Sequence, residues 1–307
     1  MSKDIVFGID IGGTSIKCGV FTVDGMLVKK EEMQTRKENS GAYIFDDIAV
    51  YIKRTLIEEE IDTEDVVGVG LGVPGAVTGD SVVNRCVNLG WGVIDAAKSL
   101  KSSLDNELGS GVCDSWKILA ANDANVAALG EYWHGSGRRF KSMMMVTVGT
   151  GVGGGLILGG KIISGFNGAA AEIGHMPIAD EFTNTCSCGK TGCLELAASA
   201  TGIARLGKKE NAKLVFDAAK AGDDEALAVI EKVSKYLAKS LACVSAVVDP
   251  EGFIIGGGVS AAGDFFIDKV KKYYKQMAFH ASRNTIIIRA QLGNDAGMHG
   301  AAKLVIG

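Results

Sequence analysis

Three cysteines and one histidine have the spacing of a metal site. Cys186, Cys188 and Cys193 form the pattern C-x-C-x4-C, and His175 lies upstream of them. Thiolates and imidazole are the ligands that structural Zn2+ takes in a tetrahedron. The glycines between the second and third cysteine let the backbone turn tightly. The spacing predicts a zinc ion that is fully coordinated by protein and therefore holds a loop rather than a substrate.

Two other interpretations of these cysteines stay open. Three thiols are an awkward number for disulfides, which are rare in cytosolic proteins of this composition. Some of the thiols can instead be small buried side chains, the role we predict for four isolated cysteines in apolar stretches: Cys18, Cys86, Cys113 and Cys243. The spacing favours zinc over both.

Two glycine-rich turns are candidate phosphate-binding sites. A predicted hairpin over residues 5–21 has Gly12-Gly13-Thr14 at its tip, and one over residues 143–158 has a tip that begins Gly149-Thr150-Gly151 and continues to Gly154. Backbone amides in such turns converge on anions, and threonine adds a hydroxyl. A single tip is more often only a turn. Two tips in equivalent places predict a duplicated domain whose turns clamp a polyphosphate in a cleft, and Asp10 can anchor hydrated Mg2+ there.

Asp123 is a candidate catalytic carboxylate. The run Asn122-Asp123-Ala124-Asn125 follows a predicted strand at 118–120 and precedes a predicted helix, which places Asp123 at a helix N-terminus and a sheet edge. Its simplest role is to cap the helix. Three Asx residues in four positions exceed what a cap requires, so we favour a carboxylate that accepts the proton of an attacking alcohol.

Further polar and glycine-rich segments flank these motifs. Glu172 lies within one turn of His175, and Glu195 follows closely after the last cysteine. On a loop fixed by metal, both carboxylates can accept hydroxyl groups, although each can equally be a solvated surface charge. The run 256–258 is a triple glycine after a predicted strand, which suits either a nucleotide base or a tight strand-to-helix joint.

The pattern of apolar residues predicts a mixed α/β protein. Helical spacing covers residues 43–60, 93–108, 125–133, 223–247 and 298–305, and short buried strands cover 66–73 and 253–255. No linker of biased composition divides the chain. We therefore predict a small N-terminal domain over residues 1–121, on which the helix at 298–307 packs back, and a large domain over 122–297 with the zinc-binding loop.

Composition and charge exclude several classes of function. The chain of 307 residues is 47% hydrophobic with a formal net charge of −4, so it lacks the basic field that collects nucleic acid or anionic membranes. The short acidic stretch before the first strand is unlike a signal peptide. The uncharged run 142–160 holds seven glycines, which disfavour a membrane helix. We expect a cytoplasmic globular protein without nucleic-acid or membrane partners.

Six motifs together resemble the ROK family of sugar kinases, open reading frames and repressors, from about Ile5 to Lys303. They are Asp10-Ile11-Gly12-Gly13-Thr14, Leu71-Gly72-Val73-Pro74-Gly75, Asn122-Asp123-Ala124-Asn125, Glu172-Ile173-Gly174-His175, the cysteine run up to Glu195, and Gly256-Gly257-Gly258. Within that family the chain looks most like the bacterial ATP-dependent glucokinases. The resemblance implies a duplicated actin-like, hexokinase-like (ribonuclease H-like) fold and a homodimer that transfers phosphate from ATP with Mg2+ to the 6-hydroxyl of glucose.

The resemblance also implies roles for individual residues. Asp123 would be the general base. The sugar would contact Asn122, Asp123, Glu172, His175 and Glu195. Zinc would be held by His175, Cys186, Cys188 and Cys193. The candidate residues for ATP and its phosphates are Asp10, Gly12, Gly13, Thr14, Lys17, Gly149, Thr150, Gly151, Gly257 and Gly258.

Two alternatives remain. A ROK kinase for another hexose, such as N-acetylmannosamine or fructose, would use the same acid and phosphate machinery. A sugar-responsive transcriptional regulator of the same family would carry an N-terminal helix-turn-helix, for which a first strand at Ile5 leaves no room.

Overall fold

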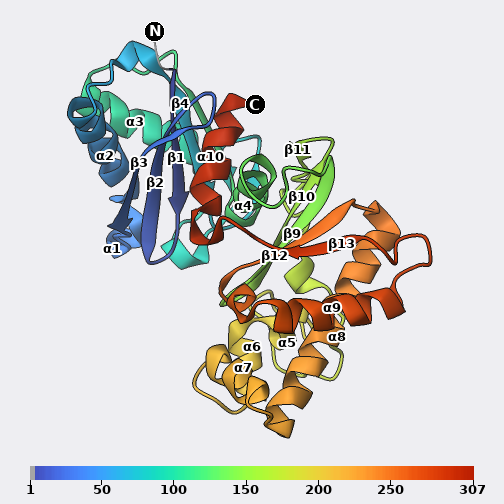
Figure 1. Ribbon diagram of the computed structural model, residues 1–307. Coiled ribbons are helices and arrows are strands. Elements are labelled where there is room, and N and C mark those ends of the chain that lie inside the picture. Colours follow the sequence, from blue (N-terminus) through green and yellow to red (C-terminus); the bar gives the residue numbers. More distant parts are fainter. Residues whose placement is uncertain (1–3) are drawn as a thin grey trace. The chain divides into compact units, whose positions relative to one another are not determined.

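The computed structural model describes residues 4–307, which form two compact units. The first unit contains the described residues up to His134, together with 164–170 and 294–307. The second contains residues 135–163 and 171–293. Each unit is built around its own five-stranded sheet (Figure 1).

The sheet of the first unit has the strand order β3-β2-β1-β4-β8. Its strands are β1 (Ile5–Ile11), β2 (Ser15–Thr22), β3 (Leu27–Gln34), β4 (Val66–Val73) and β8 (Lys117–Asn122). The first three strands are antiparallel neighbours, whereas β4 runs parallel to both β1 and β8. All of these strands except β3 were predicted from the sequence; β3 is an edge strand with four consecutive charged residues and no buried one.

Helices cover both faces of this sheet. One face of β1 presents Ile5, Phe7, Ile9 and Ile11 to a core that includes α2 (Ile44–Glu58) and α3 (Ala96–Leu108). The other face lies against α4 (Asp123–Trp133) and α10 (Ala296–Ile306), as Figure 1 shows for α10 in red. A Cβ atom on Gly8 would come within 2.1 Å of the Met298 carbonyl oxygen. The α10 backbone therefore rests directly on β1.

Short elements complete the first unit. They are α1 (Glu38–Gly41), the three-stranded sheet of β5 (Val77–Thr78), β6 (Val82–Val83) and β7 (Ile94–Asp95), and 3-10 turns at Thr63–Asp65, Val87–Leu89 and Gly293–Asp295. Asp95 caps α3 by accepting a hydrogen bond from the Lys98 amide at 3.1 Å. The apolar pattern predicts a helix that begins at Val93, and this cap explains why the helix begins at Ala96 instead.

The sheet of the second unit repeats the plan of the first. Its order is β11-β10-β9-β12-β13, with strands β9 (Ser142–Val148), β10 (Val152–Leu158), β11 (Lys161–Ile162), β12 (Gly252–Gly256) and β13 (Ile286–Arg289). Again three antiparallel strands precede two parallel additions. The prediction of a duplicated α/β fold is confirmed. The second hairpin tip is shorter than predicted, because Gly153 and Gly154 pair regularly with β9.

The second unit also contains the helices α5 (Leu194–Ala198), α6 (Ala200–Leu206), α7 (Ala212–Lys220), α8 (Asp224–Val248) and α9 (Asp264–Met277), with 3-10 turns at Ile173–His175 and Gly258–Ala262. Residues of α8 and α9 share a core with Met144, Val146 and Val148 of β9. Cys243 on α8 is exposed, so the prediction that it is buried is wrong, whereas Cys18, Cys86 and Cys113 are buried as expected.

The division into units differs from the domain limits drawn from the sequence. We placed the boundary between residues 121 and 122, whereas the first unit continues through α4 to His134. The reason is close packing of α4 on α10, where a Cβ on Gly130 would lie 2.0 Å from the Ala296 carbonyl oxygen. Within residues 4–307, no helix has the length and apolar character needed to cross a membrane.

Candidate functional site

The first sheet brings three predicted site residues to one edge. Asp10 on β1 is paired with Gly72 on β4, and Val73 on β4 is paired with Asn122 at the end of β8. Parallel strands end at the same edge of a sheet, and ligands in open α/β folds bind outside this edge. Asp10 near the end of β1 and Asn122 at the end of β8 thus lie at the same sheet edge, and Asp123 follows as the first residue of α4.

Asp10 and Asp123 interact electrostatically. The pKa of Asp10 is raised to about 7, chiefly because burial removes solvent from its carboxyl group. The negative charge of Asp123 raises this pKa further, and Lys17, its partner across the hairpin, lowers it. The carboxylate is pressed against α10, since a Cβ on Gly297 would lie 2.3 Å from its oxygen Oδ2. Two adjacent carboxylates of this kind suit a divalent cation.

Asn122, rather than Asp123, caps helix α4. Its Oδ1 accepts from the amides of Ala124 and Asn125 at 2.9 and 3.2 Å, and its Nδ2 donates to the Gly75 carbonyl oxygen at 3.1 Å. Asp123 is exposed in the first turn of the helix, where its Oδ1 accepts from the Ala124 amide at 2.8 Å. Asn122 therefore caps the helix, and the Asp123 side chain is exposed to solvent.

The turn Gly12–Thr14, which we call the first turn, joins β1 to β2. The Gly12 amide donates to the Ser15 carbonyl oxygen at 3.0 Å. Thr35, just after β3, holds the turn with two bonds: its amide donates to the Thr14 carbonyl oxygen at 3.0 Å and its Oγ1 donates to that of Gly12 at 2.7 Å. Sequence analysis missed Thr35 because it belongs to no motif and meets the turn only through the fold.

The turn Gly149–Gly151, the second turn, joins β9 to β10 in the second unit. Its Gly149 amide donates to the Gly151 carbonyl oxygen at 2.9 Å. Apart from Gly149 and its two chain neighbours, no atom of residues 4–307 lies within 4 Å of where a Gly149 Cβ would stand. Gly257 follows β12 directly beside it, with φ +79° and its Cβ position only 2.5 Å from the Val148 carbonyl oxygen. The two glycine-rich segments predicted for the second unit therefore lie together at one sheet edge.

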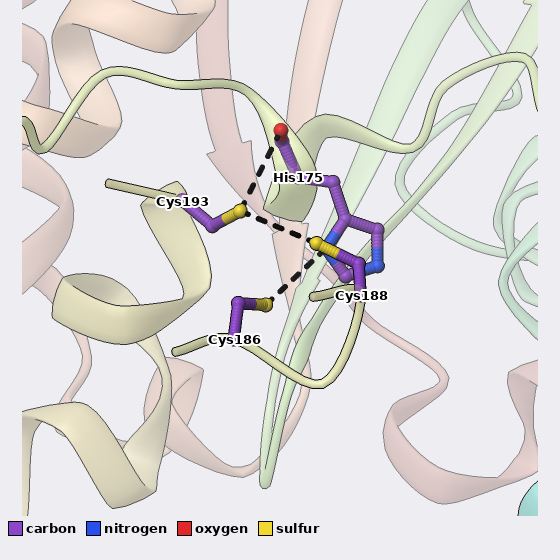
Figure 2. Close-up of side chains that lie close together, drawn as sticks. All are labelled: His175, Cys186, Cys188 and Cys193. Carbon is purple, nitrogen blue, oxygen red and sulfur yellow. Dashed lines mark hydrogen bonds between the residues drawn. The ribbon is translucent and has the colours of Figure 1, made fainter. Parts of the chain in front are cut away.

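His175, Cys186, Cys188 and Cys193 converge in the second unit, and we call them the cysteine cluster (Figure 2). One ligand atom from each lies within 4.8 Å of all the others. The His175 Nδ1 is 3.6 Å from the Cys186 Sγ, and the Cys188 and Cys193 sulfurs are also 3.6 Å apart. A tetrahedron with zinc–sulfur bonds of about 2.3 Å separates its sulfurs by about 3.8 Å. The donors and their spacing fit a zinc ion.

Glycines let the loop form. Gly189 and Gly192 have φ of +85° and +71°, a conformation that glycine adopts without strain. The Gly189 amide donates to the Cys186 carbonyl oxygen at 2.8 Å, which closes the turn that brings Cys188 back toward the other sulfurs. All seven cysteines are free thiols, so the disulfide alternative finds no support.

Glu172, His175 and Glu195 are neighbours beside the cysteine cluster. The pKa of Glu172 is raised because protein displaces solvent from it; His175 lowers this pKa and Glu195 raises it. Glu195 accepts a hydrogen bond from the Val152 amide through Oε2 at 3.0 Å, and its Oε1 lies 3.5 Å from the Ser187 hydroxyl. The structure thus brings the three predicted sugar contacts of this unit together.

The sequence profile of the ROK family matches residues 6–307. This chain belongs to the ROK family. It is 39% identical to a glucokinase of Halalkalibacterium halodurans over 99% of this chain and 96% of the relative. It is 31% identical to an N-acetylmannosamine kinase of Escherichia coli, over 97% of each chain.

A solved structure supports the same assignment. The ROK glucokinase of Streptomyces griseus, determined with glucose and AMPPNP, has a TM-score of 0.77 and 30% identity, with 98% of both chains covered. The fold prediction from sequence, a duplicated actin-like and hexokinase-like α/β protein, is confirmed for this ROK chain.

Proposed function

We propose that this ROK protein transfers the γ-phosphoryl group of ATP to the 6-hydroxyl of glucose. The proposal is carried by the 39% identity of this chain to a glucokinase over nearly its whole length. The geometry agrees with it, because Asp10, the first turn and Asp123 lie at one sheet edge. A carboxylate beside an anion-binding turn is what phosphoryl transfer to an alcohol requires.

Asp123 acts as the general base in this proposal. The 6-hydroxyl oxygen forms a bond to the γ-phosphorus, the bond from that phosphorus to the β–γ bridging oxygen breaks, and the hydroxyl proton passes to the Asp123 carboxylate. The products are glucose 6-phosphate and ADP. Exposure of Asp123 at the helix N-terminus supports this role, since a base must reach its proton.

The remaining residues bind and orient. Each of the two turns is suited to phosphate oxygens of ATP through its backbone amides and a threonine hydroxyl. Asp10 is suited to the Mg2+ that accompanies ATP, which would neutralise phosphate charge, because its carboxyl group lies at the sheet edge and within electrostatic reach of Asp123. Glu172, His175 and Glu195 serve as acceptors for sugar hydroxyls, and the Asn122 amide, anchored on Gly75, orients the reacting end.

The cysteine cluster binds one structural Zn2+ in our proposal. Its four donors satisfy the metal without an open position. His175 approaches the sulfurs through Nδ1, which leaves Nε2 for a sugar hydroxyl. The metal fixes the loop and takes no part in the transfer.

The test is an assay of ADP release with ATP, Mg2+ and a panel of hexoses, with the product identified by phosphorus NMR. We expect glucose 6-phosphate as the product and glucose as the best substrate. Absence of ADP release with every hexose would overturn the kinase assignment.

A second candidate is a kinase for N-acetylmannosamine, which the 31% identity to such a kinase favours over other hexoses. In that case N-acetylmannosamine has the highest kcat/KM in the panel. A homodimer, which the family resemblance implies, is also proposed; light scattering should give twice the chain mass of 32.0 kDa.

A further inference from the structure

The segment that follows the last cysteine holds the second turn at three points. The Ala200 amide donates to the Gly149 carbonyl oxygen at 2.7 Å. The Thr201 Oγ1 donates to the Thr150 carbonyl oxygen at 3.3 Å. At the end of the turn, the Val152 amide donates to Glu195 Oε2 at 3.0 Å. The backbone of the turn is thus fixed by residues 195–201, which are far from it in sequence.

Glu195 links the same turn to the cysteine cluster. Its second oxygen, Oε1, lies 3.6 Å from the Cys186 Sγ and 3.5 Å from the Ser187 Oγ. Cys193 occupies the N-cap position of α5, the helix whose first turn carries Glu195. Cys186 contacts Glu195 directly, and Cys193 lies two residues before it, so a movement of either cysteine would displace Glu195.

The fit of Glu195 against the turn is close. A Cβ atom on Gly151 would lie 2.5 Å from Glu195 Oε2, so even a methyl group at this position would displace the carboxylate. Glu195 is half-buried here and is flanked in α5 by buried residues, among them Leu194 and Leu196. Packing thus fixes the helix that aims the carboxylate at the turn.

We propose that Glu195 is a positioning residue for the second turn, and that through Glu195 the filled cysteine cluster sets the affinity for the phosphates of the nucleotide. This inference rests on the proposed function, because it assumes that the second turn receives phosphates. It adds a task for Glu195 beyond contact with the sugar, and it makes nucleotide binding sensitive to the metal even when no sugar is present.

The direction in which loss of the Glu195 side chain changes nucleotide affinity distinguishes two roles: positioning of the turn, and repulsion of the nucleotide by its charge. Glu195 is negative, and so is ATP, so removal of its charge alone should strengthen nucleotide binding. If Glu195 instead shapes the turn, its truncation should weaken binding, since the Val152 amide loses its acceptor and the turn loses its third support. The two explanations predict changes of opposite direction.

The experiment measures the Kd of AMPPNP with Mg2+ by calorimetry, without sugar, for zinc-loaded protein. We expect Glu195→Ala to raise the Kd by about tenfold, the cost of one charged hydrogen bond. Glu195→Gln keeps an oxygen for the Val152 amide and should stay within about threefold of wild type. Glu181→Ala is the matched control, because it removes an exposed carboxylate of the same loop region that is paired with Lys232 instead; its Kd should be unchanged.

Two outcomes would overturn the inference: a wild-type or lower Kd for Glu195→Ala, or an equal rise for Glu195→Ala and Glu195→Gln. Should Glu195→Ala fail to fold, Thr201→Val replaces it, with Thr201→Ser as its conservative partner, and the same direction of change is expected. Wild-type protein that binds no AMPPNP would refute the proposed function itself, which distinguishes the two failures.

Removal of the metal gives an independent measurement. Chelator-treated wild-type protein should show faster amide hydrogen exchange at residues 150–152 than the zinc-loaded protein, and a higher Kd for AMPPNP. Unchanged exchange at these residues after verified loss of zinc would contradict the link between the cysteine cluster and the turn.

Discussion

The first and second turns occupy equivalent places in two sheets of the same strand order, yet they are supported differently. The first turn is held by Thr35, which follows the edge strand of its own sheet. The second is held by Glu195, Ala200 and Thr201, which follow the cysteine cluster. One turn depends on the sheet that carries it, and the other on a loop with the donor set of a metal site.

This difference shows how a duplicated fold acquires two tasks. The first unit carries the carboxylates Asp10 and Asp123 at its sheet edge. The second unit has residues 171–201 after its hairpin strands, and these include the proposed acceptors for sugar hydroxyls, Glu172, His175 and Glu195. We therefore expect substitutions in the first unit to affect the chemical step, and changes at the cysteine cluster to affect binding.

Asp123→Asn should produce the largest effect. The amide keeps the shape of the side chain but cannot take a proton, so kcat should fall by at least ~100-fold while the affinity for sugar changes little. Steady-state kinetics and sugar titration of the variant measure both quantities. A kcat close to that of wild type would remove Asp123 from the role of base and erase the contrast between the units.

Loss of single sugar hydroxyls should produce the next largest effect. Glu172, His175 and Glu195 lie on or beside a fixed loop, so an analogue without one hydroxyl leaves a polar group unpaired at a cost of about 1–3 kcal/mol. Deoxyglucoses altered at positions that meet these acceptors should lose kcat/KM by about tenfold or more. Equal kcat/KM for all analogues would indicate that the second unit does not select the sugar.

Much of this arrangement could be predicted from sequence, because the informative residues are local. The spacing of Cys186, Cys188 and Cys193 predicts their convergence, and Gly189 and Gly192 have the backbone that a tight loop needs. The two turns were found from glycine and apolar strands alone. Local pattern is sufficient wherever partners lie within a few residues or in paired strands.

Contacts between distant segments could not be predicted. Nothing near Thr35 or Thr201 indicates that each holds a turn, because these bonds depend on where strands and helices come to lie. Three residues in the sequence, Asn122, Asp123 and Asn125, could cap α4, and the pattern alone does not distinguish Asn122 from the others. The predicted boundary at residue 121 leaves α4 out of the first domain. The packing of α4 on α10 joins segments that are far apart in the chain, and no local pattern indicates it.

Cys188→Ser should affect binding and stability more than the chemical step. Weaker metal binding should release zinc and loosen the loop that carries Glu195, so the KM for sugar should rise several-fold and the Tm should fall by about 5 °C or more. Elemental analysis should give about one zinc per wild-type chain. A wild-type protein without zinc after preparation free of chelators would refute the metal site, and Cys243→Ser, at an exposed cysteine, is the control.

Asp10 should give a smaller, pH-dependent effect on stability. Its pKa is raised from 3.8 to about 7 in the folded protein, so the folded state binds the proton more tightly than the unfolded state does. Without Mg2+ and nucleotide, the protein should therefore lose stability as pH rises from about 4 to about 7. Urea unfolding at pH 5 and pH 8 gives the free energy of unfolding, which should depend less on pH in Asp10→Asn than in the wild type. The same pH dependence in both proteins would show that Asp10 is not its source.

The most direct test of the central claim is a competition between glucose and N-acetylmannosamine at equal concentrations with ATP and Mg2+. The ratio of the two phosphorylated products at low conversion gives the ratio of kcat/KM values. The proposed glucokinase activity predicts a ratio of about ten or more in favour of glucose. A ratio in favour of N-acetylmannosamine would contradict it, even if the protein proves to be a kinase.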